Sequence, residues 1–433
     1  MIHCVCHAVS ISWNRAVPCF CRWGPKDNIQ EYVQLASGDI SLSIIFVSYN
    51  CLGFPFRGLL PWCPILDGCV VFPLVIPITA LVFIPVFHGL GVTTAYEYLR
   101  KRFSPAVQYA GSVLFIIQTL FYMAIVLFAP AIALEAVTNI PLWVTIIGTG
   151  LICSFYTALG GIKAVIWTDV FQFLVLFGSL IAVLIFGTKE AGGPSNVWNY
   201  NKNHSKLNFF VLNPDPTERL SLWSLIFGGA FNALPIWAVS QTAVQRFLTA
   251  RTLKEAQKSV WYNLPGNVIM MTIVSLIGLV LFAYYKGDAP QMTTNDQILI
   301  YFVSGNLDQL QGLFIACLFA GTLSTVASGL NALAAVTLID IVKAYRNGRQ
   351  TITTFPAIDQ ASEEEAAKRL DYHDTVLSKL FTLGYGILTL ALAFVAKYMG
   401  TLVQMANTVF GSIGGPLLGV FTLGVLYRRA NSG

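Results

Sequence analysis

Residues 311–342 read QGLFIACLFAGTLSTVASGLNALAAVTLIDIV. About 20 apolar residues in a helix cross the roughly 30 Å hydrocarbon core of a bilayer, and this stretch is longer than that. The whole chain has a similar character: of its 433 residues, 55% are hydrophobic and 11% charged, with a mean hydropathy of +0.66. A soluble fold of this size could not bury so much apolar surface. The sequence therefore predicts an all-α, multi-pass membrane protein.

Nine apolar stretches are long enough to span a bilayer. They lie near 69–95, 108–135, 141–160, 164–187, 222–243, 262–284, 311–342, 378–396 and 401–427. A weaker stretch near 40–60 contains Asp39 and Arg57 and is not predicted to span.

The distribution of Lys and Arg predicts the orientation, because cytoplasmic segments carry an excess of both. Basic residues concentrate on one side of the predicted spans, for example at Arg100, Lys101 and Arg102. This side is expected to be cytoplasmic, as is the polar segment 343–377. The loop 188–221 is then external, which agrees with a glycosylation sequon at Asn203.

The first 65 residues differ from the rest of the chain. Most of the nine cysteines lie near this end, and His3, Cys4, Cys6 and His7 could be read as zinc ligands. The C-x-C spacing is unlike the usual C-x2-C pair, however, so a tail unrelated to the membrane domain is the preferred interpretation. We expect a membrane domain over 66–433. The sequence shows no catalytic motif, which favours a protein that is not an enzyme and has no cofactor.

Asp169 and Gln172 form the first candidate ion site. They are three residues apart in a predicted span and so share a helix face. A carboxylate within a span is costly unless it meets a cation, a hydrogen-bond donor or water, and a carboxylate with an amide oxygen suits a hard cation. The alternative is that Asp169 pairs with Lys163 at the membrane surface.

A stripe of small and hydroxyl side chains forms the second candidate. Gly321, Ser324, Thr325 and Ser328 recur at helical spacing in the middle of a predicted span. Such stripes are often packing surfaces between helices. The alternative is a sodium site made of two hydroxyls and a freed carbonyl.

Helix breakers in the span 222–243 indicate a third feature. Gly228, Gly229 and Pro235 favour unwinding, and unwound backbone in a membrane is tolerated where it lines a cavity. Phe231, Trp237 and Gln241 would then be substrate-binding candidates. A simple proline kink is the other interpretation.

Four long segments together resemble a known family: VFHGLGVTTAYEYLRKRF, ALGGIKAVIWTDVFQ, SQTAVQRFLTARTLKEAQKS and AGTLSTVASGLNALAAVTLIDIVK. They are similar to successive signatures of the sodium/solute symporter family, solute carrier family 5. The branch they resemble contains monocarboxylate, multivitamin and iodide carriers. The resemblance runs from about Leu66 to Ser432 and implies an inverted-repeat sodium symporter core.

The resemblance also implies roles for particular residues. Gly321, Ser324 and Thr325 match the family's main sodium site, and Asp169 and Gln172 match residues of sodium coupling. Gln241 matches the first glutamine of the family's NQ-x-QVQR motif, in which Ser240 and Ala243 replace amides here, and Gln404 matches a glutamine near the substrate cavity. No family-like first core helix is recognisable in 1–65, so the nine spans would be core helices two to ten.

The expected function is sodium-coupled symport of a small organic anion, vitamin or inorganic anion across the plasma membrane. The expected partners are sodium, that solute and the lipid bilayer, with no nucleic acid. The alternative is a truncated, non-transporting member of the same family that acts through assembly or regulation.

Overall fold

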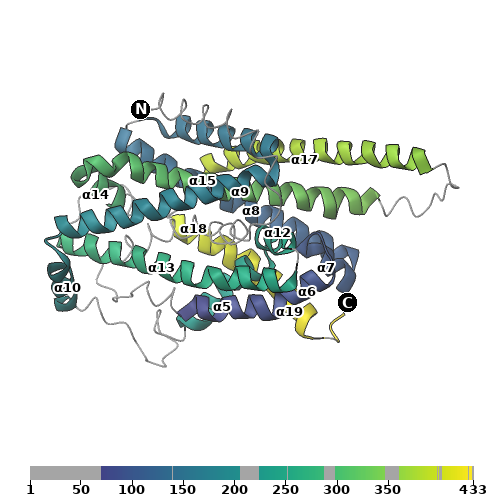
Figure 1. Ribbon diagram of the computed structural model, residues 1–433, viewed down its shortest axis with the longest axis horizontal. Coiled ribbons are helices and arrows are strands. Elements are labelled where there is room, and N and C mark those ends of the chain that lie inside the picture. Colours follow the sequence, from purple (N-terminus) through teal and green to yellow (C-terminus); the bar gives the residue numbers. More distant parts are fainter. Residues whose placement is uncertain are drawn as a thin grey trace.

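The computed structural model describes residues 70–138, 140–204, 224–250, 252–286, 298–346, 360–396, 398, 402–427 and 429–431. Every regular element in these ranges is a helix, and the long helices lie side by side (Figure 1). A helix satisfies its own backbone hydrogen bonds, which is required where no water is available. The all-α prediction is confirmed, whereas the expectation for 1–65 lies outside the described residues.

Eight helical segments are long and apolar enough to cross a membrane. They are Phe72–Gly89, Pro105–Glu135, Leu142–Leu159, Phe171–Glu190, Leu253–Tyr285, Gln311–Arg346, Tyr372–Ala396 and Met405–Leu426. Each corresponds to one of the stretches predicted from hydropathy. The remaining prediction, 222–243, corresponds to a shorter apolar helix, Ile226–Val239.

That shorter helix is irregular at both ends. It consists of η3 (Ser224–Gly229) and η4 (Pro235–Val239), both of π type, with α11 (Ala230–Leu234) between them. The backbone becomes extended at Ser240, with ψ 134°, and resumes as α12 (Gln241–Thr249). The predicted interruption therefore exists. It falls after Pro235, while Gly228 and Gly229 remain within η3.

The longest helical element, α9 (Leu142–Glu190), holds two predicted spans. The Cys153 thiol lies 3.7 Å from the Leu323 carbonyl, and the Cys317 thiol lies 4.0 Å from the Leu176 carbonyl. In straight helices, Cys153 and Leu176 would be about 35 Å apart, but Cys317 and Leu323 only about 9 Å apart. The axis of α9 must therefore turn between its two spans, so that both pack on the same neighbour.

That neighbour is α15 (Gln311–Val336), which continues into η7 (Thr337–Lys343) and is mostly buried. It packs against both halves of α9, against α8 (Pro105–Thr138) and against α17 (Gln360–Ala396). Its small residues permit close approach, since a Cβ on Gly329 would collide with the Met123 sulfur of α8. The middle of α15, where the hydroxyl stripe lies, is thereby placed at the centre of the bundle.

The shorter elements complete the bundle. They are α5 (Phe72–Ile78), η2 (Thr79–Phe83), α6 (Ile84–Gly89), α7 (Ala95–Arg102), α10 (Pro194–Asn203), α14 (Ile298–Asn306), η6 (Asp308–Leu310), α18 (Leu402–Val409), η8 (Phe410–Gly414) and α19 (Gly415–Leu426). The long helix between α12 and α14 is α13 (Leu253–Tyr285).

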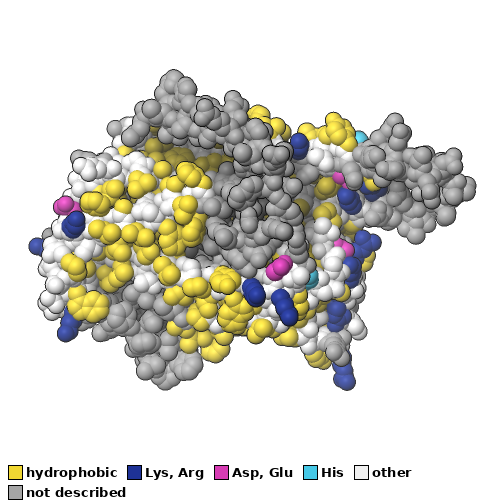
Figure 2. Space-filling view, in the orientation of Figure 1, with side chains coloured by type: hydrophobic (Ala, Val, Ile, Leu, Met, Phe, Trp, Pro, Cys, Tyr) yellow, Lys and Arg dark blue, Asp and Glu magenta, His cyan; other side chains and the backbone are white. Residues whose placement is uncertain are grey.

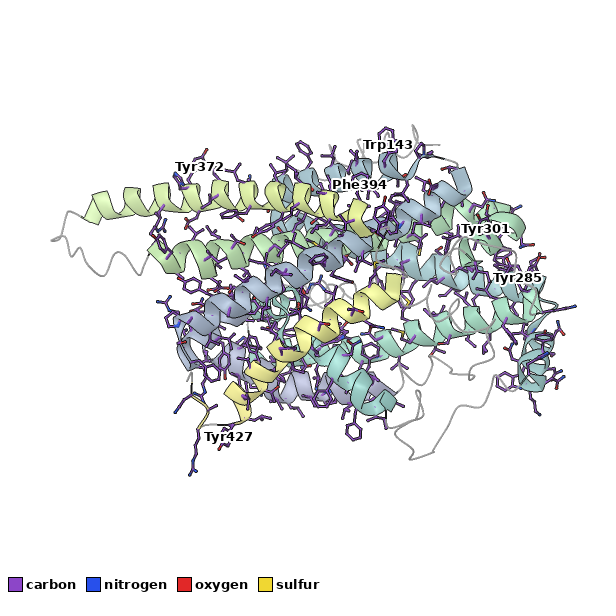
Figure 3. All side chains as sticks on the ribbon, turned by 180° about the vertical axis from the view of Figure 1, so that it is seen from behind. Trp143, Tyr285, Tyr301, Tyr372, Phe394 and Tyr427 are labelled. Carbon is purple, nitrogen blue, oxygen red and sulfur yellow. The ribbon has the colours of Figure 1, made fainter. Side chains whose placement is uncertain are left out.

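The two ends of the bundle differ in chemistry. Basic side chains gather at the end that holds α7 and the last turn of η7, while hydrophobic side chains cover much of the visible face (Figure 2). This basic end is the one predicted to be cytoplasmic. The exposed Tyr427 lies toward it, and the exposed Tyr301 lies at the opposite end (Figure 3). Tyrosines at both ends of a bundle are typical of the two membrane interfaces.

Candidate functional site

A cavity of about 60 Å³ lies between α8, α12 and α15, beside the extended backbone at Ser240. The residues that line it come from segments far apart in the sequence, including η4, η8 and α19. The broken helix and the hydroxyl stripe, which the sequence predicted separately, therefore face the same space.

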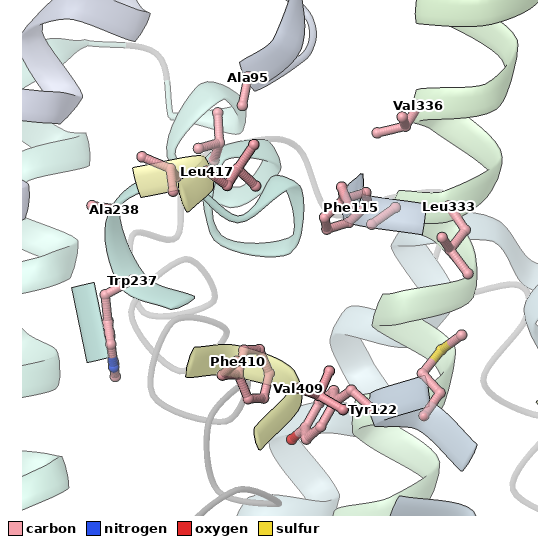
Figure 4. Close-up of a cluster of buried hydrophobic side chains, with 14 of the residues drawn as sticks. Ala95, Phe115, Tyr122, Trp237, Ala238, Leu333, Val336, Val409, Phe410 and Leu417 are labelled. Carbon is pink, nitrogen blue, oxygen red and sulfur yellow. The ribbon is translucent and has the colours of Figure 1, made fainter. Parts of the chain in front are cut away.

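One wall of the cavity is aromatic. Trp237 of η4 is buried, and Tyr122 of α8 packs edge-on against Phe410 of η8 with ring centroids 4.9 Å apart. These three side chains and Phe115 surround the same region of the interior (Figure 4). Rigid aromatic faces of this kind suit the apolar part of a small solute.

Other parts of the cavity lining are polar. The Arg246 guanidinium on α12 donates a hydrogen bond of 3.0 Å to the Ser328 hydroxyl on α15. The Ser240 and Thr242 hydroxyls are 2.7 Å apart beside the helix break. Gln118 also lines the cavity, and its side-chain oxygen is buried with no hydrogen-bond partner among the described residues.

The predicted hydroxyl pair lies in this region. Ser324 and Thr325 are both buried, and Thr325 lines the cavity. The Thr325 hydroxyl has no hydrogen-bond partner in the described part of the chain. It therefore does not bond the carbonyl one turn back in its own helix, as threonine hydroxyls in helices can. Its neighbour Thr322 behaves differently, because that hydroxyl donates to the Val126 carbonyl at 3.3 Å.

The second half of α9 runs antiparallel to α15. The Ser179 hydroxyl bonds the Leu313 carbonyl at 3.4 Å, and Cys317 contacts Leu176 one turn away. A step of three or four residues back along α9 thus matches a similar step forward along α15. One further turn of this register brings Gln172 level with Gly321. The Gln172 side-chain oxygen is buried without a hydrogen-bond partner among the described groups.

Gln241 makes contacts that the sequence did not indicate. Its side-chain oxygen accepts a hydrogen bond of 2.8 Å from the Ala95 backbone N–H, and its amide nitrogen donates to the Thr93 carbonyl at 3.4 Å. The side chain is fully buried and fastens the start of α12 to the start of α7. It is not among the residues that line the cavity.

The remaining candidates are dispersed. Trp237 lines the cavity, but Phe231 is 63% exposed and does not. Asn203 is exposed as the last residue of α10. The side chains of Asp169 and Gln404 lie outside the described atoms.

Three cavity residues were not singled out from the sequence. Arg246 stands in one of the segments that resemble the family but was given no role of its own, and Gln118 and Tyr122 lie in the predicted span 108–135. The spacing of Gln118 and Tyr122 at i and i+4 on α8 was the available signal, since it puts both on one helix face.

A helical membrane domain with a cavity beside an interrupted helix is the architecture of a secondary transporter. The chain belongs to the sodium:solute symporter family, whose model matches residues 69–433. This match confirms the resemblance found in the sequence, and the family is one of transporters rather than enzymes.

Curated relatives agree with this assignment. The chain is 43% identical over 372 residues to the sodium-dependent multivitamin transporter of Oryctolagus cuniculus. The matched region covers 84% of this chain and 55% of that protein. It is 40% identical over 365 residues to the human sodium-coupled monocarboxylate transporter 1, covering 83% of this chain and 57% of that protein. The chain thus spans little more than half the length of these relatives.

Solved structures agree as well. A substrate-bound, outward-open sodium-coupled sialic acid symporter matches with a TM-score of 0.78 and 25% identity, covering 95% of this chain and 81% of that one. A nucleobase-cation-symport-1 family transporter in a closed conformation matches with a TM-score of 0.58 and 16% identity, covering 93% and 79%. The second likeness concerns the fold alone.

Proposed function

We propose that this chain is the membrane domain of a plasma-membrane symporter that couples sodium entry to uptake of a small anion. The anion is an organic carboxylate, a vitamin that carries one, or an inorganic ion. The names of the multivitamin and monocarboxylate relatives support this class of solute.

The observation that carries the proposal is the position of Arg246. Its guanidinium lies at the wall of a mostly apolar cavity and bonds the Ser328 hydroxyl. Arginine stays protonated at physiological pH, and the bond to Ser328 fixes its charge at the cavity wall. A fixed cation in surroundings of low dielectric constant favours an anion and disfavours a neutral molecule of the same shape.

Sodium would bind beside this cavity. The Thr325 hydroxyl is unbonded within the described chain, which supports this position, and the proposed ligands are Gly321, Ser324, Thr325, Asp169 and Gln172. Uncharged oxygens with one carboxylate suit a hard monovalent ion that must also be released. Sodium entry supplies about 2.3 kcal/mol per 100 mV of membrane potential, in addition to its concentration gradient.

The transport step would be alternating access. The helix break at Ser240 places α12, and with it Arg246, next to extended backbone. Such breaks allow one repeat of the fold to rock against the other around a central site. Solute and sodium would thus be exposed to each side of the membrane in turn, with no covalent chemistry.

Two solutes of nearly identical shape test the proposal. Nicotinate carries a carboxylate where nicotinamide carries a neutral amide. We expect purified protein in liposomes to accumulate nicotinate under an inward sodium gradient, and not under a potassium gradient. We expect little accumulation of nicotinamide under either gradient. Equal uptake under both gradients would contradict sodium coupling, and equal uptake of both solutes would contradict the role given to Arg246.

A further inference from the structure

A hydrogen bond between α9 and α15 lies next to the predicted sodium ligands on α15. The Tyr156 hydroxyl of α9 donates to the Leu323 backbone carbonyl at 2.9 Å. The Cys153 thiol, one turn earlier on α9, lies 3.7 Å from the same carbonyl and 3.8 Å from the Tyr156 hydroxyl. Leu323 directly precedes Ser324, so two side chains of α9 converge on the peptide group that joins these residues.

The Tyr156 bond is additional to what the backbone of α15 requires. In an α-helix the Leu323 carbonyl accepts from the N–H of Ala327, four residues further on. The helix α15 is continuous through this turn, and a carbonyl oxygen has two lone pairs. The Tyr156 hydroxyl therefore adds a second bond to a helical carbonyl, and this bond fixes the turn of α15 against α9.

A second bond from the same turn of α15 has a different cause. Pro130 of α8 has no backbone N–H, so the Val126 carbonyl four residues earlier lacks its usual helical donor. The Thr322 hydroxyl of α15 donates to this carbonyl at 3.3 Å. That bond supplies a donor to the backbone of α8, whereas the Tyr156 bond acts on the backbone of α15 itself.

The two halves of α9 both contact α15 near this turn. The second half runs antiparallel to α15 and brings Gln172 level with Gly321. The first half reaches Leu323, two residues further along α15, through Tyr156. Because both halves belong to one helical element, the Tyr156 bond sets the position of this turn relative to Gln172.

We propose that Tyr156 is a positioning residue for sodium binding. Its hydroxyl holds the carbonyl that precedes Ser324, so that the oxygens of Ser324 and Thr325 are in place before the ion arrives. This role rests on the proposed sodium site at these residues. Groups that orient metal ligands through hydrogen bonds affect metal affinity strongly, although they do not touch the ion. Ligands that are already ordered also lower the cost of binding.

The test measures binding of radioactive sodium-22 to the purified full chain in detergent, so it does not depend on transport. Tyr156→Phe removes one hydroxyl and keeps the ring, and we expect it to fold and to weaken sodium affinity by about tenfold. Cys153→Ala should have a smaller effect, because a thiol is a weak donor. Thr322→Ala is the matched control, because it also removes one bond between this turn of α15 and a neighbouring helix. It should lower the midpoint of thermal unfolding and leave sodium affinity unchanged.

Ser324→Ala separates the role of Tyr156 from the site on which it rests, and size-exclusion profiles check that each variant is folded. If Ser324→Ala weakens sodium binding while Tyr156→Phe binds sodium as the parent does, the site stands and the role of Tyr156 is overturned. If Ser324→Ala leaves the affinity unchanged, the site itself fails, and the role of Tyr156 fails with it. The role is also overturned if Thr322→Ala weakens binding as much as Tyr156→Phe, because the loss would then follow from looser packing alone.

Discussion

Arg246 and Ser328 form a hydrogen bond of 3.0 Å that connects α12, just after the helix break, to α15. The bond joins the basic side chain of the cavity to the last hydroxyl of the stripe that also contains Ser324 and Thr325. The proposed anion and sodium sites therefore share one helix. A movement of α12 that carries Arg246 would be transmitted to α15 through this contact.

The first prediction concerns Arg246. Replacing it by glutamine keeps most of its length and removes its charge, so the anion loses its fixed counter-charge. We expect Arg246→Gln to raise the KM for nicotinate by tenfold or more, about 1.4 kcal/mol. Sodium-dependent uptake in liposomes measures this change. Ser328→Ala is the companion variant and should have a smaller effect, because the guanidinium charge remains. Equal KM values for Arg246→Gln and the parent would contradict the anion site.

The second prediction separates sodium ligands from packing residues on α15. Thr325→Ala and Ser324→Ala each remove one oxygen, and we expect both to shift half-activation by sodium to higher concentration. Thr322→Ala is the matched control, because the Thr322 hydroxyl is bonded to the Val126 carbonyl of α8. It should lower thermal stability without changing the sodium activation curve. If all three variants give the parent's curve, the stripe is only a packing surface.

The third prediction concerns Asp169, the carboxylate of the first candidate ion site, three residues before Gln172 on α9. Asp169→Asn keeps the size and removes the charge, so transport should fall more than surface expression if Asp169 couples sodium to the solute. If Asp169 only pairs with Lys163 at the membrane surface, Lys163→Gln should be equally damaging. Uptake normalised to surface-biotinylated protein distinguishes these results. Equal losses confined to the expression level would support the interfacial pair.

Hydropathy and motif were enough to predict the spans and the hydroxyl stripe. A spanning helix is defined by its own composition, and Ser324 and Thr325 are neighbours in the sequence. The contacts of Gln241 and Arg246 could not be predicted in this way. Whether a glutamine reaches a cavity or the backbone of Ala95 depends on how α12 packs against α7. Arg246 resembles any other basic residue near a span until Ser328 is placed opposite it.

The burial of Asp340 could not be predicted from the sequence either. The sequence places an acidic residue at the end of an apolar span, three residues before Lys343, which suggests an ordinary surface position. Its burial depends on Thr94 and Gln108, which are more than 200 residues away in the sequence. Residues whose roles depend on such distant partners are the ones that local patterns do not reveal.

The fourth prediction tests the packing of α9 against α17. A Cβ on Gly150 would collide with the Leu390 side chain and would lie 3.2 Å from Leu127. We expect Gly150→Ala to destabilise the protein by about 1–3 kcal/mol, because well-packed interiors tolerate added volume poorly. The midpoint of thermal unfolding in detergent measures this change. The double variant Gly150→Ala/Leu390→Ala should be more stable than Gly150→Ala, because the shorter side chain removes the collision. Leu390→Ala alone should not stabilise the protein.

The fifth prediction concerns orientation. The excess of basic residues at the end that holds α7 predicts that α10 is external and that the start of the span Tyr372–Ala396 is cytoplasmic. Asn203 is exposed at the end of α10, and Tyr372 is 73% exposed on α17. In a background whose native cysteines are replaced, an impermeant maleimide should label Asn203→Cys on intact cells. It should label Tyr372→Cys only after the cells are permeabilised. Each site is the control for the other, because both become accessible once the membrane is opened. Labelling of Tyr372→Cys on intact cells would reverse the topology.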